Sequence, residues 1–123
     1  MPTILVIDDD ATVRTMVDTI LTAHGYAVLT AADGETGLAL ARTRLPDLVL
    51  SDLSMEGLDG FDVLLRLRAP GTTSRIPIIF TTGQPNFQGL MQGMKLSASE
   101  YLAKPFTPEG LVAAVQQALT AKP

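Results

Sequence analysis

Short apolar runs alternate with amphipathic stretches along this chain. Residues 4–7 form a continuous apolar run, as expected of a strand buried on both faces, and three aspartates end it. Apolar residues then recur at helical spacing from Val13 to His24, and Gly25 follows where a left-handed residue commonly ends a helix. The first unit is therefore predicted to be a strand followed by a helix.

The alternation continues to the end of the chain. Four more strands are expected at residues 26–30, 48–51, 76–81 and 101–103. Four more helices are expected at residues 34–44, 61–68, 86–96 and from Pro108 onward. Five strands alternating with five helices predict an α/β fold with right-handed crossovers, in which one doubly wound parallel sheet carries helices on both faces.

The helical patterns also predict which side chains face the core and which cap the ends. In helix 34–44 we expect Leu38, Ala41 and Leu45 to point inward. Thr107 is the expected N-cap of the last helix, whose inward residues are Leu111, Val112, Val115 and Leu119. Structural roles are favoured for three polar features: Asp10 as an N-cap, Asp59-Gly60 as a turn, and His24 as a core or C-terminal capping residue.

Composition limits the classes of protein that this chain can belong to. Its 123 residues, 46% of them hydrophobic, suit one compact domain over residues 1–123 with no output domain in the chain. The lack of cysteine and the single His24 exclude disulfides and make a zinc site a poor hypothesis. No apolar run approaches the roughly 18 residues of a membrane span, so we expect a cytoplasmic protein without a membrane partner.

Charge is distributed unevenly. The formal net charge of −4 argues against direct binding of nucleic acid. Residues 1–62 contain eleven acids and three bases, whereas residues 63–123 contain six bases and two acids. A site for a hard cation is therefore expected in the first half.

Polar residues follow four of the five predicted strands directly. They are Asp8 and Asp9 after the first strand, Asp52 after the third, Thr82 after the fourth and Lys104 after the fifth. In parallel α/β sheets, ligands bind beyond the carboxyl ends of the strands, so these side chains are expected to form one site. Carboxylates about 4 Å apart repel by about 4 kcal/mol per pair at an effective dielectric constant near 20, and Mg²⁺ is the cation that suits them. One carboxylate could then attack a phosphoryl group, with Lys104 and Thr82 stabilising the transferred oxygens.

Four segments in this order resemble the response-regulator receiver domain, the CheY-like family of two-component signalling. They are Ile4 to Asp10, Pro46 to Asp52 with Asp59-Gly60, Pro77 to Gly83, and Tyr101 to Phe106. The resemblance covers essentially the whole chain and implies the flavodoxin-like strand order 2-1-3-4-5. It also implies a cis peptide bond between Lys104 and Pro105.

The resemblance implies a role for each candidate site residue. Asp52 would be the phosphoacceptor, Asp8, Asp9 and Asp52 would hold Mg²⁺ together with the backbone carbonyl of Ser54, and Lys104 and Thr82 would sense the phosphoryl group. Tyr101 would change rotamer with Thr82. Departures from the family pattern include Glu56, where proline is usual, and variable residues at Ser54 and Gln84, positions that tune the lifetime of the phosphoryl group.

The function implied is a phosphorylation-controlled switch rather than an enzyme. A histidine kinase or a histidine phosphotransfer protein would supply the phosphoryl group, and the domain would slowly hydrolyse it. The surface of the fourth helix, fifth strand and fifth helix would then bind an output protein or a second copy of the chain. Phe87, Leu90 and Met94 are expected to contribute to that surface beside Tyr101.

Two alternatives remain open at this point. An aspartate-nucleophile phosphatase of the haloacid dehalogenase kind also places an aspartate after a strand, although Ser54 occupies the position of its second aspartate. The other alternative is a pseudo-receiver that binds partners without using phosphate. That class usually lacks one of the acids or the lysine, and all of them are present here.

Overall fold

A five-stranded parallel sheet forms the centre of the molecule. The computed structural model describes residues 1–55, 57–83 and 100–120. The strands lie in the order β2-β1-β3-β4-β5, with bounds β1 Thr3–Ile7, β2 Ala27–Ala31, β3 Leu48–Asp52, β4 Ile78–Thr82 and β5 Glu100–Ala103. The helices are α1 Ala11–Ala23, α2 Gly34–Arg44, α3 Gly60–Arg68 and α5 Pro108–Thr120. This confirms the predicted α/β class and the order 2-1-3-4-5.

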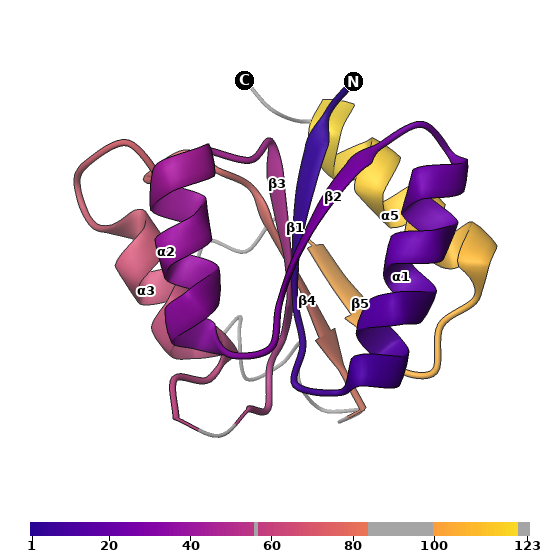
Figure 1. Cartoon of the computed structure of the whole chain (residues 1–123), viewed down its shortest axis with the longest axis horizontal. Helices are drawn as coiled ribbons and strands as arrows, with labels where there is room; N and C mark the ends of the chain where they lie inside the picture. Colours follow the sequence, from indigo (N-terminus) through magenta and orange to yellow (C-terminus); the bar gives the residue numbers. More distant parts are fainter. Residues whose placement is uncertain (56, 84–99, 121–123) are drawn as a thin grey trace.

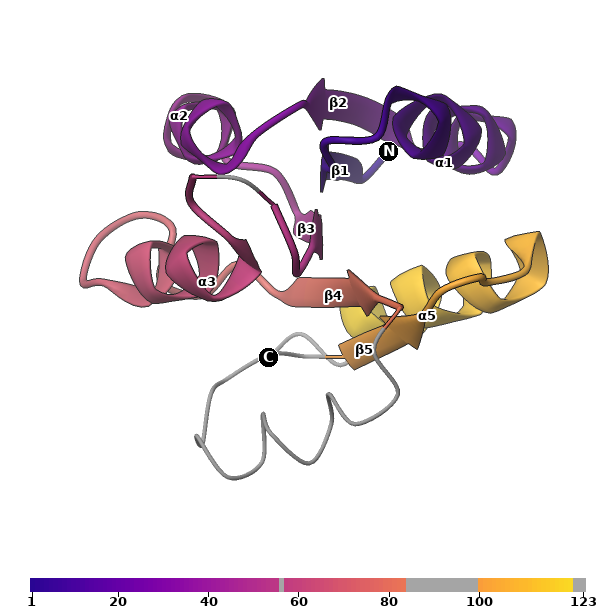
Figure 2. The same ribbon diagram turned by 90° about the horizontal axis from the view of Figure 1, so that it is seen from below.

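Helices cover both faces of the sheet. Figures 1 and 2 show α2 and α3 on one face and α1 and α5 on the other. Side chains of β1 alternate between these layers, because Leu5 and Ile7 pack toward α2 and α3 while Ile4 and Val6 pack toward α1 and α5. Both faces of the strand are therefore apolar, as its continuous apolar run predicts.

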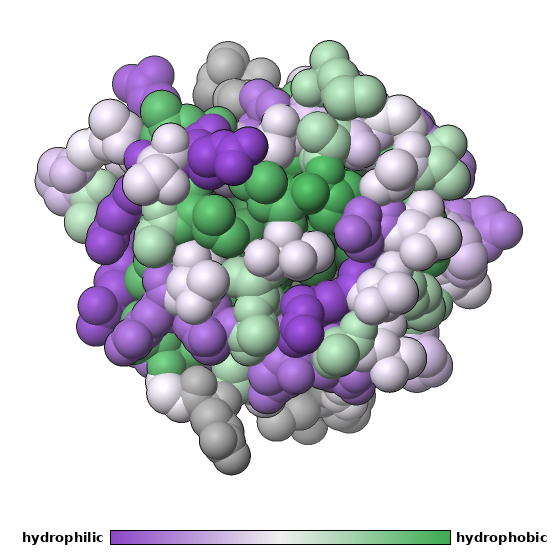
Figure 3. Space-filling view, in the orientation of Figure 1, coloured by the Kyte–Doolittle hydropathy of each residue, from purple (hydrophilic) through white to green (hydrophobic). Residues whose placement is uncertain are grey.

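The β2 edge of the sheet is covered less completely than its centre. Most residues of β2 are half-buried, whereas β3 and β4 are buried throughout. In the orientation of Figure 1, apolar residues gather across the middle of this face, between the regions occupied by α1 and α2 (Figure 3). The strands β1, β3 and β4 are thus more enclosed than β2, and side chains at their ends are presented from the buried part of the sheet.

Short polar side chains fix where the helices begin. Asp10 is the N-cap of α1 and accepts hydrogen bonds from the amides of Thr12 and Val13. Asp59 and Asp62 form a reciprocal capping box at the start of α3. These contacts confirm the structural role predicted for Asp10 and give Asp59 a helix cap as its structural role.

His24 ends α1 as its C-cap. Its ring Nδ1 lies 2.9 Å from the carbonyl oxygen of Ile20, and its side chain is exposed. Gly25 follows with φ +89°, the left-handed conformation expected there. Of the two roles predicted for His24, capping is correct and core packing is wrong.

The inward orientation predicted for Leu45 is wrong. Leu45 is 51% exposed and is the C-cap of α2, with φ 46°. In this conformation the chain turns away from the helical path, so the 3.6-residue spacing from Leu38 and Ala41 no longer places Leu45 on the inward face. Two further apolar helix residues, Met16 of α1 and Leu65 of α3, are also exposed.

Some predictions concern residues outside the described part of the chain. The fourth predicted helix, at residues 86–96, lies there, and so does the proposed surface of Phe87, Leu90 and Met94. Glu56 and Gln84 also lie outside it. Among the described residues, no helix is both long and apolar enough to cross a lipid bilayer.

Candidate functional site

Strand register brings the predicted site residues to one edge of the sheet. Ile7 of β1 pairs with Ser51 of β3, so Asp8, which directly follows β1, and Asp52, the last residue of β3, lie side by side. On the far side of β4, the Lys104 amide donates a hydrogen bond of 2.7 Å to the carbonyl oxygen of Thr82. The ends of β1, β3 and β5 therefore place two carboxylates and one ammonium group at the same edge.

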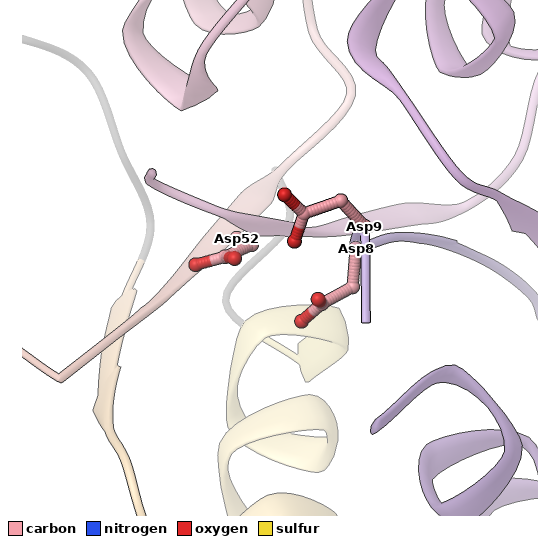
Figure 4. A group of neighbouring side chains, drawn as sticks. All are labelled: Asp8, Asp9 and Asp52. Atoms are coloured by element: carbon pink, nitrogen blue, oxygen red, sulfur yellow. The ribbon is translucent and has the colours of Figure 1, made fainter. Parts of the chain in front are cut away.

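Three carboxylates form the centre of this site. Asp8, Asp9 and Asp52 each contribute a carboxylate oxygen, and these oxygens all lie within 4.8 Å of one another. Figure 4 shows the three side chains gathered beyond the strand ends. Asp8 is 2% exposed and Asp52 is 9% exposed, whereas Asp9 is exposed. A cation could reach such a cluster from the side of Asp9, and hard oxygen donors of this kind suit Mg²⁺.

Lys104 bridges two of these carboxylates. Its Nζ atom lies 3.1 Å from Oδ2 of Asp8 and 3.5 Å from Oδ1 of Asp52. The peptide bond between Lys104 and Pro105 is cis, as the family resemblance implies. One ammonium group therefore faces three carboxylates, which leaves the site with excess negative charge.

Burial and neighbouring charges shift two pKa values in the site. Burial raises the pKa of Asp52 above its ordinary value of 3.8, the charges of Asp8 and Asp9 act in the same direction, and the Lys104 ammonium opposes them. Burial lowers the pKa of Lys104, but its hydrogen bond to Asp8 and the charges of both aspartates outweigh burial and raise it overall. The lysine is therefore held in its charged form.

Thr82, Tyr101 and Ser54 lie around this centre. Thr82 is buried at the end of β4. Tyr101 is half-buried on β5, opposite Phe80 of β4, and packs against the core on the α2 and α3 side. Ser54 is exposed in the loop two residues beyond β3.

Two residues that the sequence interpretation did not assign to the site support it. Arg14 of α1 donates a hydrogen bond of 2.7 Å from Nη1 to the carbonyl oxygen of Asp8. Gly60 packs so closely beneath the end of β3 that an added Cβ would lie 2.8 Å from the carbonyl oxygen of Asp52. Arg14 is the only lysine or arginine in residues 1–41, and this isolation in an acidic segment is the sequence feature that could have drawn attention to it. Gly60 was interpreted as part of the Asp59-Gly60 turn, so its close packing against β3 was not expected.

The sequence and fold match one protein family over nearly the whole chain. Residues 4–116 match the family described as response regulator receiver domain. The chain belongs to this family. Receiver domains of two-component systems act in phosphorylation-controlled signalling, and the relatives are named as regulators rather than as enzymes.

Curated relatives support the same family membership. The chain is 41% identical over 119 residues to the DNA-binding dual master transcriptional regulator RpaA of Synechocystis. The match covers 97% of this chain and 49% of RpaA. It is 38% identical over 119 residues to the transcriptional regulatory protein AfsQ1 of Streptomyces coelicolor, covering 97% of this chain and 52% of AfsQ1. The chain thus spans about half the length of these relatives.

Solved structures of similar fold include the chemotaxis response regulator CheY4 of Vibrio cholerae. The two chains superpose with a TM-score of 0.89 at 34% sequence identity. The match covers 97% of this chain and 99% of CheY4. The receiver fold is therefore shared over the full length of a protein of similar size.

Proposed function

We propose that Asp52 is the phosphoacceptor of this receiver domain. The observation that carries the proposal is the convergence of Asp52 with two further carboxylates and Lys104 at the carboxyl ends of the strands. A carboxylate oxygen of Asp52 attacks the phosphorus of a phosphorylated donor, and the bond from phosphorus to the donor breaks. The donor leaves with that bond's electron pair, and Asp52 becomes an acyl phosphate.

The donor set fits Mg²⁺, and Asp8, Asp9 and Asp52 would hold it with the backbone carbonyl of Ser54. Bound there, Mg²⁺ would neutralise carboxylate charge and contact a phosphoryl oxygen. Asp8 is already held by Lys104, so the exposed Asp9 is the carboxylate most open to a direct ligand role. This assignment agrees with the excess negative charge of the site.

Lys104 and Thr82 would act on the transferred phosphoryl group. The ammonium group of Lys104 lies 3.5 Å from the Asp52 carboxylate, so it can shift its contact to a phosphoryl oxygen attached there. The Thr82 hydroxyl would donate to a second phosphoryl oxygen, and Tyr101 would adjust its rotamer on β5. Both changes would alter the surface of β5 and α5.

That surface would transmit the signal to a partner. A histidine kinase or histidine phosphotransfer protein would supply the phosphoryl group, and the domain would slowly hydrolyse its acyl phosphate. The output partner would be a separate protein, a second copy of the chain or a further domain, and the relative RpaA is named as a DNA-binding regulator. Family membership also supports the expectation that the domain works in the cytoplasm.

Phosphorylation by a small donor tests the proposal and its alternatives. The protein is mixed with Mg²⁺ and acetyl phosphate, and intact mass spectrometry should show the gain of one phosphoryl group. Asp52→Asn should abolish that gain. Asp59→Asn is the matched control, because asparagine also caps helices, and it should label like the parent.

Other outcomes would favour other functions. Labelling of the Asp52→Asn variant at a different residue would refute the assignment. Turnover of many phosphate esters per protein would indicate the phosphatase alternative. A parent that neither binds Mg²⁺ nor gains mass would indicate a pseudo-receiver.

A further inference from the structure

Arg14 is placed unusually for a basic residue. It lies in the first turns of α1, where the partial positive charge of the helix N-terminus disfavours a cation by about 0.3 to 1 kcal/mol. Side chains of a helix lean toward its N-terminus, and this one reaches back to the carbonyl oxygen of Asp8, six residues earlier. The 2.7 Å hydrogen bond gives the guanidinium a partner at the edge of the acidic site.

The bond from Arg14 completes the set of contacts that hold Asp8. The Asp8 amide donates to the carbonyl oxygen of Ala31 at 3.1 Å. Its carboxylate accepts from the Asp10 amide through Oδ1 at 2.9 Å and from Lys104 through Oδ2 at 3.1 Å. Arg14 holds the remaining polar atom, the carbonyl oxygen. The peptide unit between Asp8 and Asp9 therefore depends on Arg14 for one of its two ends.

Asp9 is held differently. It is exposed, and no described residue donates a hydrogen bond to its carboxylate. Its position relative to Asp52 is therefore set by the backbone, and specifically by the peptide plane whose carbonyl oxygen Arg14 holds. Arg14 is the only side chain among the described residues that hydrogen-bonds this carbonyl group.

We propose that Arg14 is a positioning residue for the phosphoryl-transfer site, which orients the Asp8–Asp9 peptide so that Asp9 can ligate Mg²⁺. The proposal rests on the proposed function, since it concerns the same site. It assigns Arg14 no contact with the phosphoryl group. Residues that orient metal ligands in this indirect way typically change metal affinity by about 10-fold to 100-fold when they are lost.

Two effects of removing Arg14 have opposite signs, and this makes the proposal testable. Loss of its positive charge alone would strengthen Mg²⁺ binding, because the cation would meet less repulsion. Loss of its hydrogen bond would weaken Mg²⁺ binding, because Asp9 would be less well oriented. We expect the second effect to dominate.

The experiment compares three substitutions by isothermal titration of Mg²⁺. Arg14→Met keeps the apolar stem but neither the charge nor the donor, and its affinity for Mg²⁺ should fall about 10-fold. Arg14→Gln keeps a donor without the charge, and Arg14→Lys keeps both with a shorter reach, so both should bind Mg²⁺ more tightly than Arg14→Met. Arg66→Met, an exposed arginine of α3, is the matched control and should bind like the parent.

The kinetics of labelling distinguish weaker Mg²⁺ binding from a general loss of stability. For Arg14→Met, the Mg²⁺ concentration that half-saturates labelling by acetyl phosphate should rise about 10-fold, while the maximal rate falls less than about 2-fold. Circular dichroism checks that each variant is folded.

The outcomes separate this proposal from the proposed function. If the parent binds Mg²⁺ and gains a phosphoryl group, but Arg14→Met binds Mg²⁺ equally well or more tightly, the positioning role is wrong and the phosphoacceptor assignment stands. Equal affinities of the Met, Gln and Lys variants would also overturn the role of the hydrogen bond. If the parent binds no Mg²⁺, the positioning role fails, and if the parent also gains no phosphoryl group, the proposed function fails with it.

Discussion

The Nζ atom of Lys104 lies 3.1 Å from Oδ2 of Asp8, although 96 positions separate the two residues in the chain. Asp8 follows β1 at the centre of the sheet, and Lys104 follows β5 at its edge. The lysine side chain therefore reaches past the end of β4 to the central strands. It is 24% exposed, whereas the Asp8 side chain is 2% exposed.

This ion pair predicts the effect of Lys104→Met on stability. Without the ammonium group two adjacent, largely buried carboxylates lose their compensation, and the free energy of unfolding at neutral pH without Mg²⁺ should fall by about 1 to 3 kcal/mol. That loss is smaller than for a fully buried pair because part of the lysine is in solvent. Urea denaturation of parent and variant measures it.

The pH dependence of that loss has a defined direction. The pKa of Lys104 is raised above 10.5 in the folded state, so its contribution is complete below pH 10.5 and disappears as the pH rises through the raised value. On the acidic side the difference should also shrink as the carboxylates become protonated. A difference that stayed constant from pH 3 to pH 8 would contradict an electrostatic origin.

Asp52→Asn should change stability in the opposite direction. The pKa of Asp52 is raised in the folded state, so the unfolded chain binds fewer protons between pH 3.8 and that raised value, and the parent loses stability as the pH increases through this interval. Asparagine does not titrate and is nearly isosteric. The variant should therefore equal the parent below pH 3.8 and exceed it above the interval, in thermal unfolding without Mg²⁺.

Lower stability of Asp52→Asn at neutral pH would contradict this account. It would mean that the attraction between Asp52 and Lys104 outweighs burial and the repulsion from Asp8 and Asp9.

Mg²⁺ should stabilise the folded protein by mass action. At 100 times its dissociation constant a ligand that binds only the folded state adds about 2.7 kcal/mol, so the melting temperature should rise with Mg²⁺ concentration. Asp9→Asn should flatten this response. Asp10→Asn is the control, because asparagine preserves the N-cap of α1 and the response should remain. Equal responses of the two variants would remove Asp9 from the metal site.

Gly60 predicts a steric effect on the site. An alanine Cβ at Gly60 would lie 2.8 Å from the Asp52 carbonyl oxygen and 2.8 Å from the Leu53 Cα, both backbone atoms. Gly60→Ala should therefore destabilise the fold by about 1 to 3 kcal/mol and slow phosphorylation by displacing the end of β3. Gly83→Ala is the matched control, since no described atom lies within 4 Å of its added Cβ, and it should change stability by less than about 0.5 kcal/mol. If Gly60→Ala were as stable as the parent, the prediction would be wrong, because the backbone at Asp52 and Leu53 would then shift to accommodate the added Cβ at little cost.

Much of the fold could be predicted because its signals are local. The bounds of α2 match the expected residues 34–44, and each predicted strand overlaps an observed one to within about two residues at its ends. The candidate site could be predicted for a different reason. Parallel strands all end at one edge, so the residues that follow them converge without any knowledge of their distances.

Other features depend on backbone geometry that periodicity does not contain. Leu45 fits the inward spacing of α2, but its left-handed cap conformation turns it into solvent. The contact of Arg14 with Asp8 depends on how α1 leaves β1, and the close packing of Gly60 depends on where α3 lies against the end of β3. Sequence spacing specifies neither arrangement.

The position of Lys104 also has a consequence for the order in which the site is built. The three carboxylates lie at the ends of β1 and β3, while the ammonium group that compensates their charge belongs to Lys104, which follows the edge strand β5. During synthesis the three aspartates are therefore added to the chain before the lysine. In the finished protein, brief detachment of β5 would withdraw the ammonium group while the anionic cluster persists. Acceptance of a phosphoryl group would then require that the edge strand β5 is in place in the sheet.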